Sequence, residues 1–263
     1  MQCEQTLSAC IVTYNNADKI STVVSSIKRY TNDVDYKLYI SDNGSSDSTV
    51  DNALAADKDA VILKNGSNLG FGKAHNVCIP YLNSKYHAVI NPDIEIKSDV
   101  LPALCRYLDE HGDVVMVTPR ILYPNGREQV LPKRKPSLKY LLGRRLPIFK
   151  KAVNEYTMSD IVIDKPIQIE FCTGCFFVIR TDIFKKIGGF DDRFFMYFED
   201  ADLTLRASEY GKAIFLPEYS VIHSWERSSS KSIKYLLIHI ISMFKFLIKH
   251  RKRRLHENTY HRS

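Results

Sequence analysis

The chain of 263 residues lacks a signal-peptide pattern, a membrane-spanning apolar run and a paired-cysteine framework. Its start, MQCEQT, has neither the basic residues nor the apolar core of a signal peptide. The six cysteines are scattered, and the one C-x-x-C motif, Cys172 to Cys175, has no second pair or histidine partner. We therefore expect the cysteines to be small core residues in a reducing compartment, the cytoplasm.

Glycine is absent before Gly44. That absence argues against a glycine-rich phosphate loop after the first strand, which a sugar-1-phosphate nucleotidyltransferase would need, because Tyr14, Asn15 and Asn16 stand in its place. Nucleic-acid motifs are missing too, with no RRM, zinc-finger or helix-turn-helix pattern. We expect no nucleic-acid partner.

The net charge of +7 is unevenly distributed. Residues 127–151 hold nine Lys or Arg against one Glu, and residues 231–263 hold nine against one. The rest of the chain is net acidic. The basic character therefore belongs to two local surfaces.

Short apolar runs alternate with helical patterns over the first 118 residues, which predicts an α/β fold with a mostly parallel, Rossmann-like sheet and flanking helices. In such sheets, ligands bind beyond the carboxyl ends of the strands. The chain is long enough for one large domain, which we place at residues 1–226. The expected strands are 7–14, 36–41, 61–63, 88–91, 114–118, 167–172, 176–180 and 213–216, with helices after 16 and 47 and around 72–83, 99–111 and 181–187.

Polar clusters follow three of these strands, at 13–15, 42–44 and 91–93. Any one of them has a plain explanation as turn chemistry, since Asn, Asp, Gly and Pro are common in turns. Three on the same expected edge favour a binding site. The glycine-rich segment 70–72 precedes a helix, so its backbone could approach a ligand closely.

Five bulky residues, FFMYF at 194–198, run directly into Glu199, Asp200 and Asp202. If a helix begins near Glu199, the acids lie in its first turn, where the helix dipole favours negative charge. Capping alone would explain them. The alternative is a general base, because a carboxylate held against apolar rings has a raised pKa, suited to accepting a proton.

After Pro119 the alternation stops. The Asn125-Gly126 pair predicts a hairpin turn, and residues 132–165 are expected to form a flexible basic loop at the surface. A lone His223 after an apolar pair is more often structural than a metal ligand.

The tail, residues 227–263, predicts a basic amphipathic helix with one polar stripe, which includes Ser242, Lys245 and Lys249. Its longest uncharged run, 235–244, is too short to span a bilayer, which needs about 20 residues. An anionic membrane surface is the expected partner. Packing on the core or on a second subunit, as in a homodimer, remains the alternative.

In order along the chain, these motifs resemble those of family-two inverting glycosyltransferases with the GT-A fold. Within them, the chain looks most like the rhamnosyltransferases that build bacterial O-antigens, capsules and cell-wall polysaccharides. The resemblance covers about residues 6–226. It rests on the joint order of IVTYN (11–15), SDNGSSD (41–47), NLGFG (68–72) with Asn76, NPD (91–93), Thr173-Gly174, GGFD (188–191), EDADL (199–203) and His223.

The resemblance implies roles for the matched residues. Asp200 would be the catalytic base and Glu199 its neighbour. Asp93 would be the main ligand of a Mg²⁺ or Mn²⁺ ion, with His223 as a second ligand, and Asp202 with Arg206 would support the loop. The residues implied to bind the nucleotide sugar are Thr13, Asn15, Asp42, Asn68, Gly70, Asn76 and Asn91.

The resemblance also implies an activity: transfer of L-rhamnose from dTDP-rhamnose to a lipid-diphosphate-linked glycan, on the inner face of the cell membrane. UDP-galactofuranose or another UDP-sugar is the alternative donor. Two other classes stay open, a nucleotidyltransferase and an inactive sugar-nucleotide-binding protein.

Overall fold

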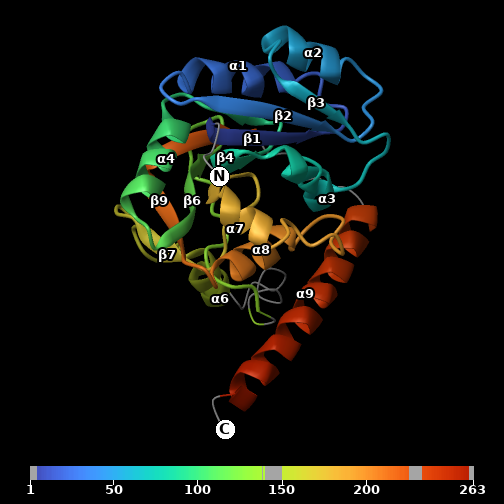
Figure 1. Ribbon diagram of the computed structural model, residues 1–263. Coiled ribbons are helices and arrows are strands. Elements are labelled where there is room, and N and C mark those ends of the chain that lie inside the picture. Colours follow the sequence, from blue (N-terminus) through green and yellow to red (C-terminus); the bar gives the residue numbers. More distant parts are fainter. Residues whose placement is uncertain (1–4, 138, 140–149, 225–232, 261–263) are drawn as a thin grey trace.

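The computed structural model describes residues 5–137, 139, 150–224 and 233–260 (Figure 1). In this part of the chain one mixed sheet runs in the order β3-β2-β1-β4-β8-β6-β9-β5, with β7 paired to β9. The strands are β1 (Gln5–Thr13), β2 (Tyr36–Asp42), β3 (Val61–Lys64), β4 (Ser84–Ile90), β5 (Ile94–Glu95), β6 (Val114–Leu122), β7 (Ile167–Ile169), β8 (Phe176–Arg180) and β9 (Lys212–His223). The helices are α1 (Ile20–Tyr30), α2 (Thr49–Ala56), α3 (Phe71–Asn76), a 3₁₀ turn (Ile79–Tyr81), α4 (Val100–Glu110), α6 (Lys150–Thr157), α7 (Thr181–Lys186), α8 (Glu199–Ala207) and α9 (Ile233–Tyr260).

The parallel half of the sheet confirms the predicted alternation. β1 pairs in parallel with β2 and β4, and β2 with β3. Thr13 lies opposite Asp42 in this register, so the polar segments that follow β1 and β2 leave the sheet at the same edge. The sequence pattern placed them there because the carboxyl ends of neighbouring parallel strands coincide.

The sheet separates two apolar cores because successive side chains of a strand point to opposite faces. On one face Ala9 and Ile11 pack in the core that includes α1, α2 and α4. On the other face Cys10 packs in the core that includes α3, α7 and α8 (Figure 1). The described cysteines are free and buried, as expected of small core residues.

The second half of the chain departs from simple alternation. β8 is antiparallel to β4 and to β6, whereas β6 and β9 are parallel. β9 extends to His223 past a register shift near Pro119, where the sequence predicted a strand ending at Leu216. The expectation of one continuous loop over 132–165 is wrong for residues 150–157, which form α6. Residues 138 and 140–149 lie outside the described part.

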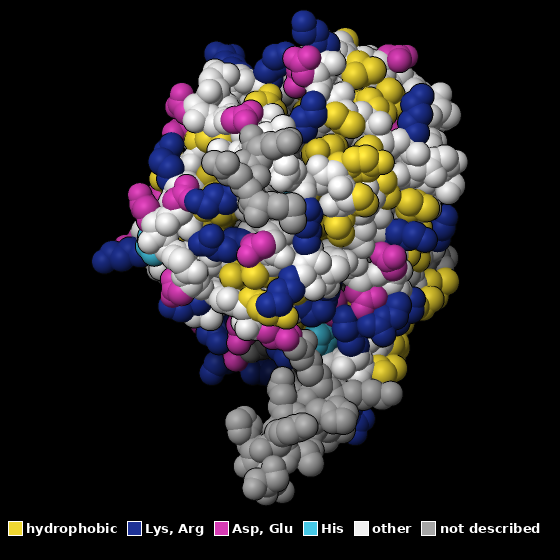
Figure 2. Space-filling model, in the orientation of Figure 1, with side chains coloured by type: hydrophobic (Ala, Val, Ile, Leu, Met, Phe, Trp, Pro, Cys, Tyr) yellow, Lys and Arg dark blue, Asp and Glu magenta, His cyan; other side chains and the backbone are white. Residues whose placement is uncertain are grey.

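The tail forms the expected helix, and no helix in the described residues is long and apolar enough to cross a membrane. α9 lies beside the rest of the molecule, and its last turns extend past it (Figure 1). A third apolar cluster joins it to the segment before α8, with Phe246 only 1% exposed. On the face shown in Figure 2, acidic and basic side chains are interspersed.

Candidate active site

The ends of β1 and β2 hold three of the expected nucleotide-contacting residues together. The hydroxyl of Thr13 donates to Asp42 Oδ1 over 3.2 Å. Both carboxylate oxygens of Asp42 accept the N–H of Ser45, at 3.3 and 3.2 Å. Asn15 has a left-handed backbone (φ 55°), and its N–H donates to Ser45 Oγ. These contacts fix the loop that follows β2 against the loop that follows β1.

Asn43 joins this cluster to the glycine-rich segment. Its side-chain N–H donates to the carbonyl oxygen of Gly70 at 3.1 Å, and its Oδ1 accepts the N–H of Leu69. Asn68 Oδ1 in turn accepts the N–H of Gly70. Asn68 and Gly70 therefore lie beside the Asp42 loop.

Asn76 binds a different segment. Its side chain donates to the carbonyl oxygen of Phe190 at 2.7 Å and accepts the N–H of the same residue at 2.8 Å. A second contact joins it to Asp192. Asn76 thus connects α3 to the segment between α7 and α8. Its place among the nucleotide-contacting residues stays a prediction.

The glycine-rich segment also touches the residues before α8, which we call the aromatic loop (residues 194–198). The N–H of Phe71 donates to the carbonyl oxygen of Phe195 at 3.0 Å. Gly70 has φ 83°, and a Cβ there would lie 2.2 Å from that oxygen. Only glycine allows this approach, since other residues disfavour this backbone region.

Tyr197 and Phe198 both adopt left-handed backbone conformations, with φ 69° and 68°. Such conformations cost about 1–3 kcal/mol each in non-glycine residues and occur mainly at functional sites. Phe198 is buried, and α8 begins at the next residue. The strained pair therefore sets the direction in which the first turn of α8 leaves the aromatic loop.

Asp200 and Glu199 occupy different environments although they are neighbours. Asp200 Oδ2 accepts the N–H of Gly174 at 3.0 Å, and Oδ1 accepts the N–H of Ala201. Burial raises the pKa of Asp200 to about 6, although these two N–H groups favour its ionised form. Asp200 is therefore mostly ionised at neutral pH and can still accept a proton.

Glu199 is 5% exposed, and its Oε2 is buried with no hydrogen-bond partner among the described residues. Burial, with the charge of Asp200 second, raises the pKa of Glu199 well above its ordinary value. Its surroundings therefore favour the neutral form of the Glu199 carboxyl over the charged form. Of the two acids, Asp200 is the one suited to act as a base.

Asp93 and His223 meet where β5 pairs with the end of β9. Asp93 Oδ1 lies 3.2 Å from His223 Nε2, and Nδ1 of the ring is 3.2 Å from Gln129 Oε1. The side-chain amide of Asn91 lies 3.5 Å from the same Nε2 atom. Burial alone lowers the pKa of His223, but its contacts with Asp93 and Cys175 outweigh burial and raise the pKa to about 10.

This pair is a suitable partial site for a divalent cation. A carboxylate oxygen and a neutral imidazole nitrogen are ligands that Mn²⁺ accepts, so a bound ion would have to displace the proton that His223 holds beside Asp93. Mg²⁺ commonly binds through one or two carboxylates together with substrate phosphates. Among the described residues no group of three potential ligands occurs. Asp93 and His223 would therefore hold the ion together with the donor's phosphates.

A short path of backbone contacts joins the pair to Asp200. Asp200 binds the N–H of Gly174, and the carbonyl oxygen of the next residue, Cys175, accepts the N–H of Asn91 at 2.9 Å. Asn91 contacts His223. The two halves of the site therefore lie on either side of one segment, residues 173–175.

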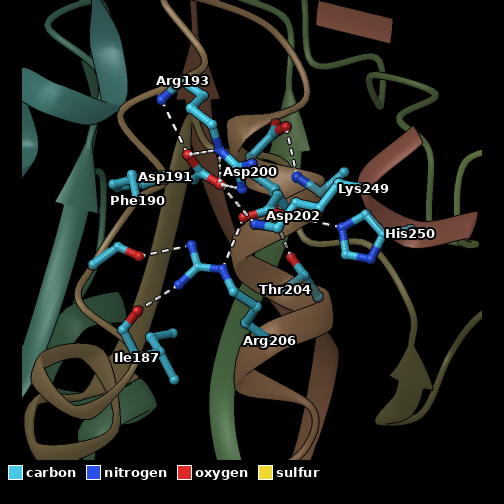
Figure 3. A network of polar contacts seen from close by, with 12 residues as sticks. Ile187, Phe190, Asp191, Arg193, Asp200, Asp202, Thr204, Arg206, Lys249 and His250 are labelled. Atoms are coloured by element: carbon cyan, nitrogen blue, oxygen red, sulfur yellow. Dashed lines mark hydrogen bonds and ion pairs between the residues drawn. The ribbon is translucent and has the colours of Figure 1, made fainter. Parts of the chain in front are cut away.

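Asp202 lies at the centre of a network of polar contacts (Figure 3). Of its partners, the sequence suggested Arg206 but not Lys249 or His250. Asp202 is fully buried and binds Arg206, as the sequence suggested, at 2.8 Å. Its other oxygen meets Lys249 at 2.5 Å and His250 at 2.9 Å, both from α9. Burial alone raises the pKa of Asp202, but its hydrogen bonds to His250 and Lys249 and the charges of Arg206 and Lys249 lower it to about 2. The sequence signal for Lys249 was its place in the polar stripe of the tail.

The fold and the site together define a nucleotide-sugar glycosyltransferase. The profile of "Glycosyl transferase family 2" matches residues 8–188. The chain belongs to this family, as its motifs suggested. The match is to glycosyltransferases and not to nucleotidyltransferases, which decides between those two classes.

Two curated relatives are similar along most of the chain. Rhamnosyltransferase WbbL of Escherichia coli (strain K12) is 27% identical over 271 residues, 96% of this chain and 96% of its own length. N-acetylglucosaminyl-diphospho-decaprenol L-rhamnosyltransferase of Mycobacterium tuberculosis is 26% identical, covering 92% of this chain and 83% of its own.

Among solved structures, GalNAc-T7 with UDP, GalNAc and Mn²⁺ superposes with a TM-score of 0.66 at 15% identity. The match covers 85% of this chain and 44% of that one. This shared fold places the chain among GT-A proteins. The crystal complex shows that a protein of this fold binds UDP and Mn²⁺.

Proposed function

We propose that the protein transfers L-rhamnose from dTDP-rhamnose to a lipid-diphosphate-linked saccharide during assembly of a surface polysaccharide such as an O-antigen, a capsule or a cell-wall glycan. Both curated relatives are named rhamnosyltransferases, and the name of the second specifies a diphospho-decaprenol acceptor. The observation that carries the proposal is the path from Asp200 through Gly174 and Cys175 to Asn91 and the Asp93–His223 pair.

The chemistry follows from the two carboxyl groups. The acceptor hydroxyl gives its proton to Asp200, and its oxygen forms a bond to the anomeric carbon of the sugar. The bond from that carbon to the diphosphate breaks, and the nucleoside diphosphate leaves with the electron pair. One displacement of this kind inverts the anomeric centre.

Burial and the charge of Asp200 favour the protonated form of Glu199, which cannot accept the proton. A divalent cation, when bound by Asp93 and His223, would neutralise the charge of the departing diphosphate. Thr13, Asn15 and Asp42 are the residues that we propose for the nucleotide, since they form one cluster at the strand ends.

A donor such as UDP-galactofuranose or a UDP-hexose is the second candidate. The fold of the UDP complex of GalNAc-T7 favours it, because that structure shares the architecture of this chain. Both candidates use the same base and the same cation site.

We also propose that the protein works at the cytoplasmic face of the cell membrane, as a peripheral enzyme on an anionic lipid surface. A lipid-linked acceptor would be presented there. Support comes from α9, whose exposed apolar residues include Leu237, Ile241 and Phe244.

A donor panel tests the proposal. Nucleoside diphosphate release is measured with dTDP-rhamnose, UDP-galactofuranose and UDP-glucose, with and without Mn²⁺, and with a lipid-diphosphate saccharide as acceptor. We expect the fastest release from dTDP-rhamnose, and a loss of release in Asp200→Asn. Faster release from a UDP-sugar would overturn the donor assignment alone, whereas no release from any donor in the presence of acceptor and Mn²⁺ would overturn the activity.

A further inference from the structure

One face of α9 holds the residues around Asp200 in place. This inner face consists of His239, Ser242, Phe246, Lys249 and His250. Ser242 Oγ donates to the carbonyl oxygen of Met196 at 2.8 Å, inside the aromatic loop. Phe246 and His239 lie against the strained Phe198, with ring centroids 5.5 and 5.3 Å away.

The same face reaches the carboxylates on both sides of Asp200 in the sequence. Lys249 bridges Asp191 at 2.7 Å and Asp202 at 2.5 Å, and His250 binds Asp202 as well. Figure 3 shows both α9 side chains converging on Asp202. Asp202 lies two residues after Asp200 in the first turn of α8. The position of α8, and with it of Asp200, therefore depends on α9.

The opposite face of α9 is apolar, and it is exposed in the part of the chain that the structure describes. This outer face consists of Leu237, Ile241, Phe244 and Ile248, which are 53–59% exposed. Residues 4, 7 and 11 positions apart share one side of a helix. Ser242 and Phe246 stand on the other side. Hydrophobic side chains show at the right-hand edge of Figure 2, where Figure 1 places α9.

Charge selects the partner for the outer face. Exposed Lys234, Lys245 and Arg251 flank the apolar residues, and residues 231–256 contain no Asp or Glu. If a second copy of the chain docked through this face, the flanking basic residues of the two copies would be brought together and would repel each other. An anionic bilayer instead offers an apolar interior for the outer face and negative headgroups for the flanking lysines and arginine.

We propose that α9 couples membrane docking to catalysis: its outer face binds an anionic bilayer, and docking steadies the inner face that positions the Asp200 loop. This inference rests on the proposed transferase activity. Lys249 acts here as a positioning residue through Asp202 and Asp191. The vesicle-bound enzyme is then faster than the free enzyme on the same acceptor.

The test measures transfer to a water-soluble acceptor analogue, so that acceptor delivery does not depend on lipid. Full-length protein is assayed alone, with phosphatidylglycerol–phosphatidylcholine vesicles and with pure phosphatidylcholine vesicles. Anionic vesicles are expected to raise kcat about fivefold or more, the range of typical allosteric couplings. In parallel, amide hydrogen exchange of residues 194–202 is expected to slow on vesicle binding.

Three variants separate the two faces. Joint serine substitution of the outer face (Leu237→Ser, Ile241→Ser, Phe244→Ser, Ile248→Ser) should abolish vesicle binding and the rate increase together. Lys249→Met should keep vesicle binding but lose most of the increase. In the Lys249→Met variant, Asp202 still pairs with Arg206 and His250. Lys28→Met, on α1, is the matched control: it removes a lysine from a buried aspartate, Asp57, which follows α2, and it should retain the full increase.

Several results would overturn the coupling. One is that anionic vesicles change neither the transfer rate nor the hydrogen exchange of residues 194–202. Another is that Lys249→Met shows the same rate increase with anionic vesicles as the wild type. An equal response to neutral vesicles, or a concentration-dependent dimer that the outer-face variant abolishes, would overturn the choice of an anionic bilayer. If transfer proceeds in all forms without regard to lipid, the coupling fails while the proposed function stands. If no form turns over any donor, the proposed function fails.

Discussion

Replacing Asp200 by Asn should remove most of the activity and at the same time stabilise the fold. The substitution keeps an oxygen that can accept the N–H of Gly174, but it removes the group that accepts the acceptor's proton. General-base catalysis is typically worth about 10²–10⁴ in rate. We expect a loss of that order in kcat, with donor affinity retained because Asp200 lies outside the strand-end cluster.

The effect on stability has a definite sign. The pKa of Asp200 is raised from 3.8 to about 6 in the folded chain, so its contribution to stability is present below pH 3.8 and is lost as the pH rises through 6. A shift of about two units corresponds to about 3 kcal/mol. Asp200→Asn should therefore unfold at higher urea concentration than the wild type at pH 8, by up to that amount, and the gain should shrink toward pH 4.

The pH profile of the wild type supplies a third readout. Transfer needs ionised Asp200, so kcat/KM should fall as the pH drops through about 6. Glu199→Gln is the matched control, because burial favours the uncharged form of the Glu199 carboxyl and Gln is an uncharged group of nearly the same shape. This variant should keep far more activity than Asp200→Asn.

The reasoning would be refuted by an Asp200→Asn enzyme that keeps its rate and the acid limb of its profile. Equal losses in Asp200→Asn and Glu199→Gln would show that the two carboxyl groups do not differ as their surroundings indicate. Single-turnover transfer measures the rate, and isothermal calorimetry with the nucleotide sugar measures donor binding.

Two further predictions concern the donor side of the site. Gly70→Ala should abolish transfer and lower the free energy of unfolding by more than the roughly 1–2 kcal/mol of backbone strain, because the new Cβ would lie 2.2 Å from the Phe195 carbonyl oxygen. The control is Gly126→Ala, which has φ 80° and no atom within 4 Å of the added Cβ, so a urea titration should show the backbone strain alone. Equal losses of stability in the two variants would contradict the contact with Phe195. Asp93→Asn should raise the Mn²⁺ concentration needed for half-maximal transfer, with metal-free nucleotide binding retained and exposed Asp99→Asn as control; an unchanged Mn²⁺ titration would place the ion elsewhere.

The parts of the site that follow from local pattern were predictable. Thr13 and Asp42 end parallel strands, and strand ends can be inferred from apolar runs and turn residues. The raised pKa of Asp200 followed from the aromatic run before it. These features depend on neighbours within a few residues.

The other parts depend on contacts between residues far apart in the sequence. Asp200 differs from Glu199 by the N–H groups that its carboxylate accepts, and one of these belongs to Gly174, 26 residues away. His250 reaches Asp202 across 48 residues, and Asn76 reaches Phe190 across 114. No spacing rule within one element reveals such pairs. α6 was missed because prolines and basic residues dominate the segment around it.

The left-handed backbone at Phe198 places two opposed demands on one position. Glycine would relax the backbone, but it would leave a void between Phe246 and His239. A large ring fills that space against α9, at a backbone cost of about 1–3 kcal/mol. No amino acid meets both demands, so the strained backbone at Phe198 is retained for the packing that its ring provides against α9.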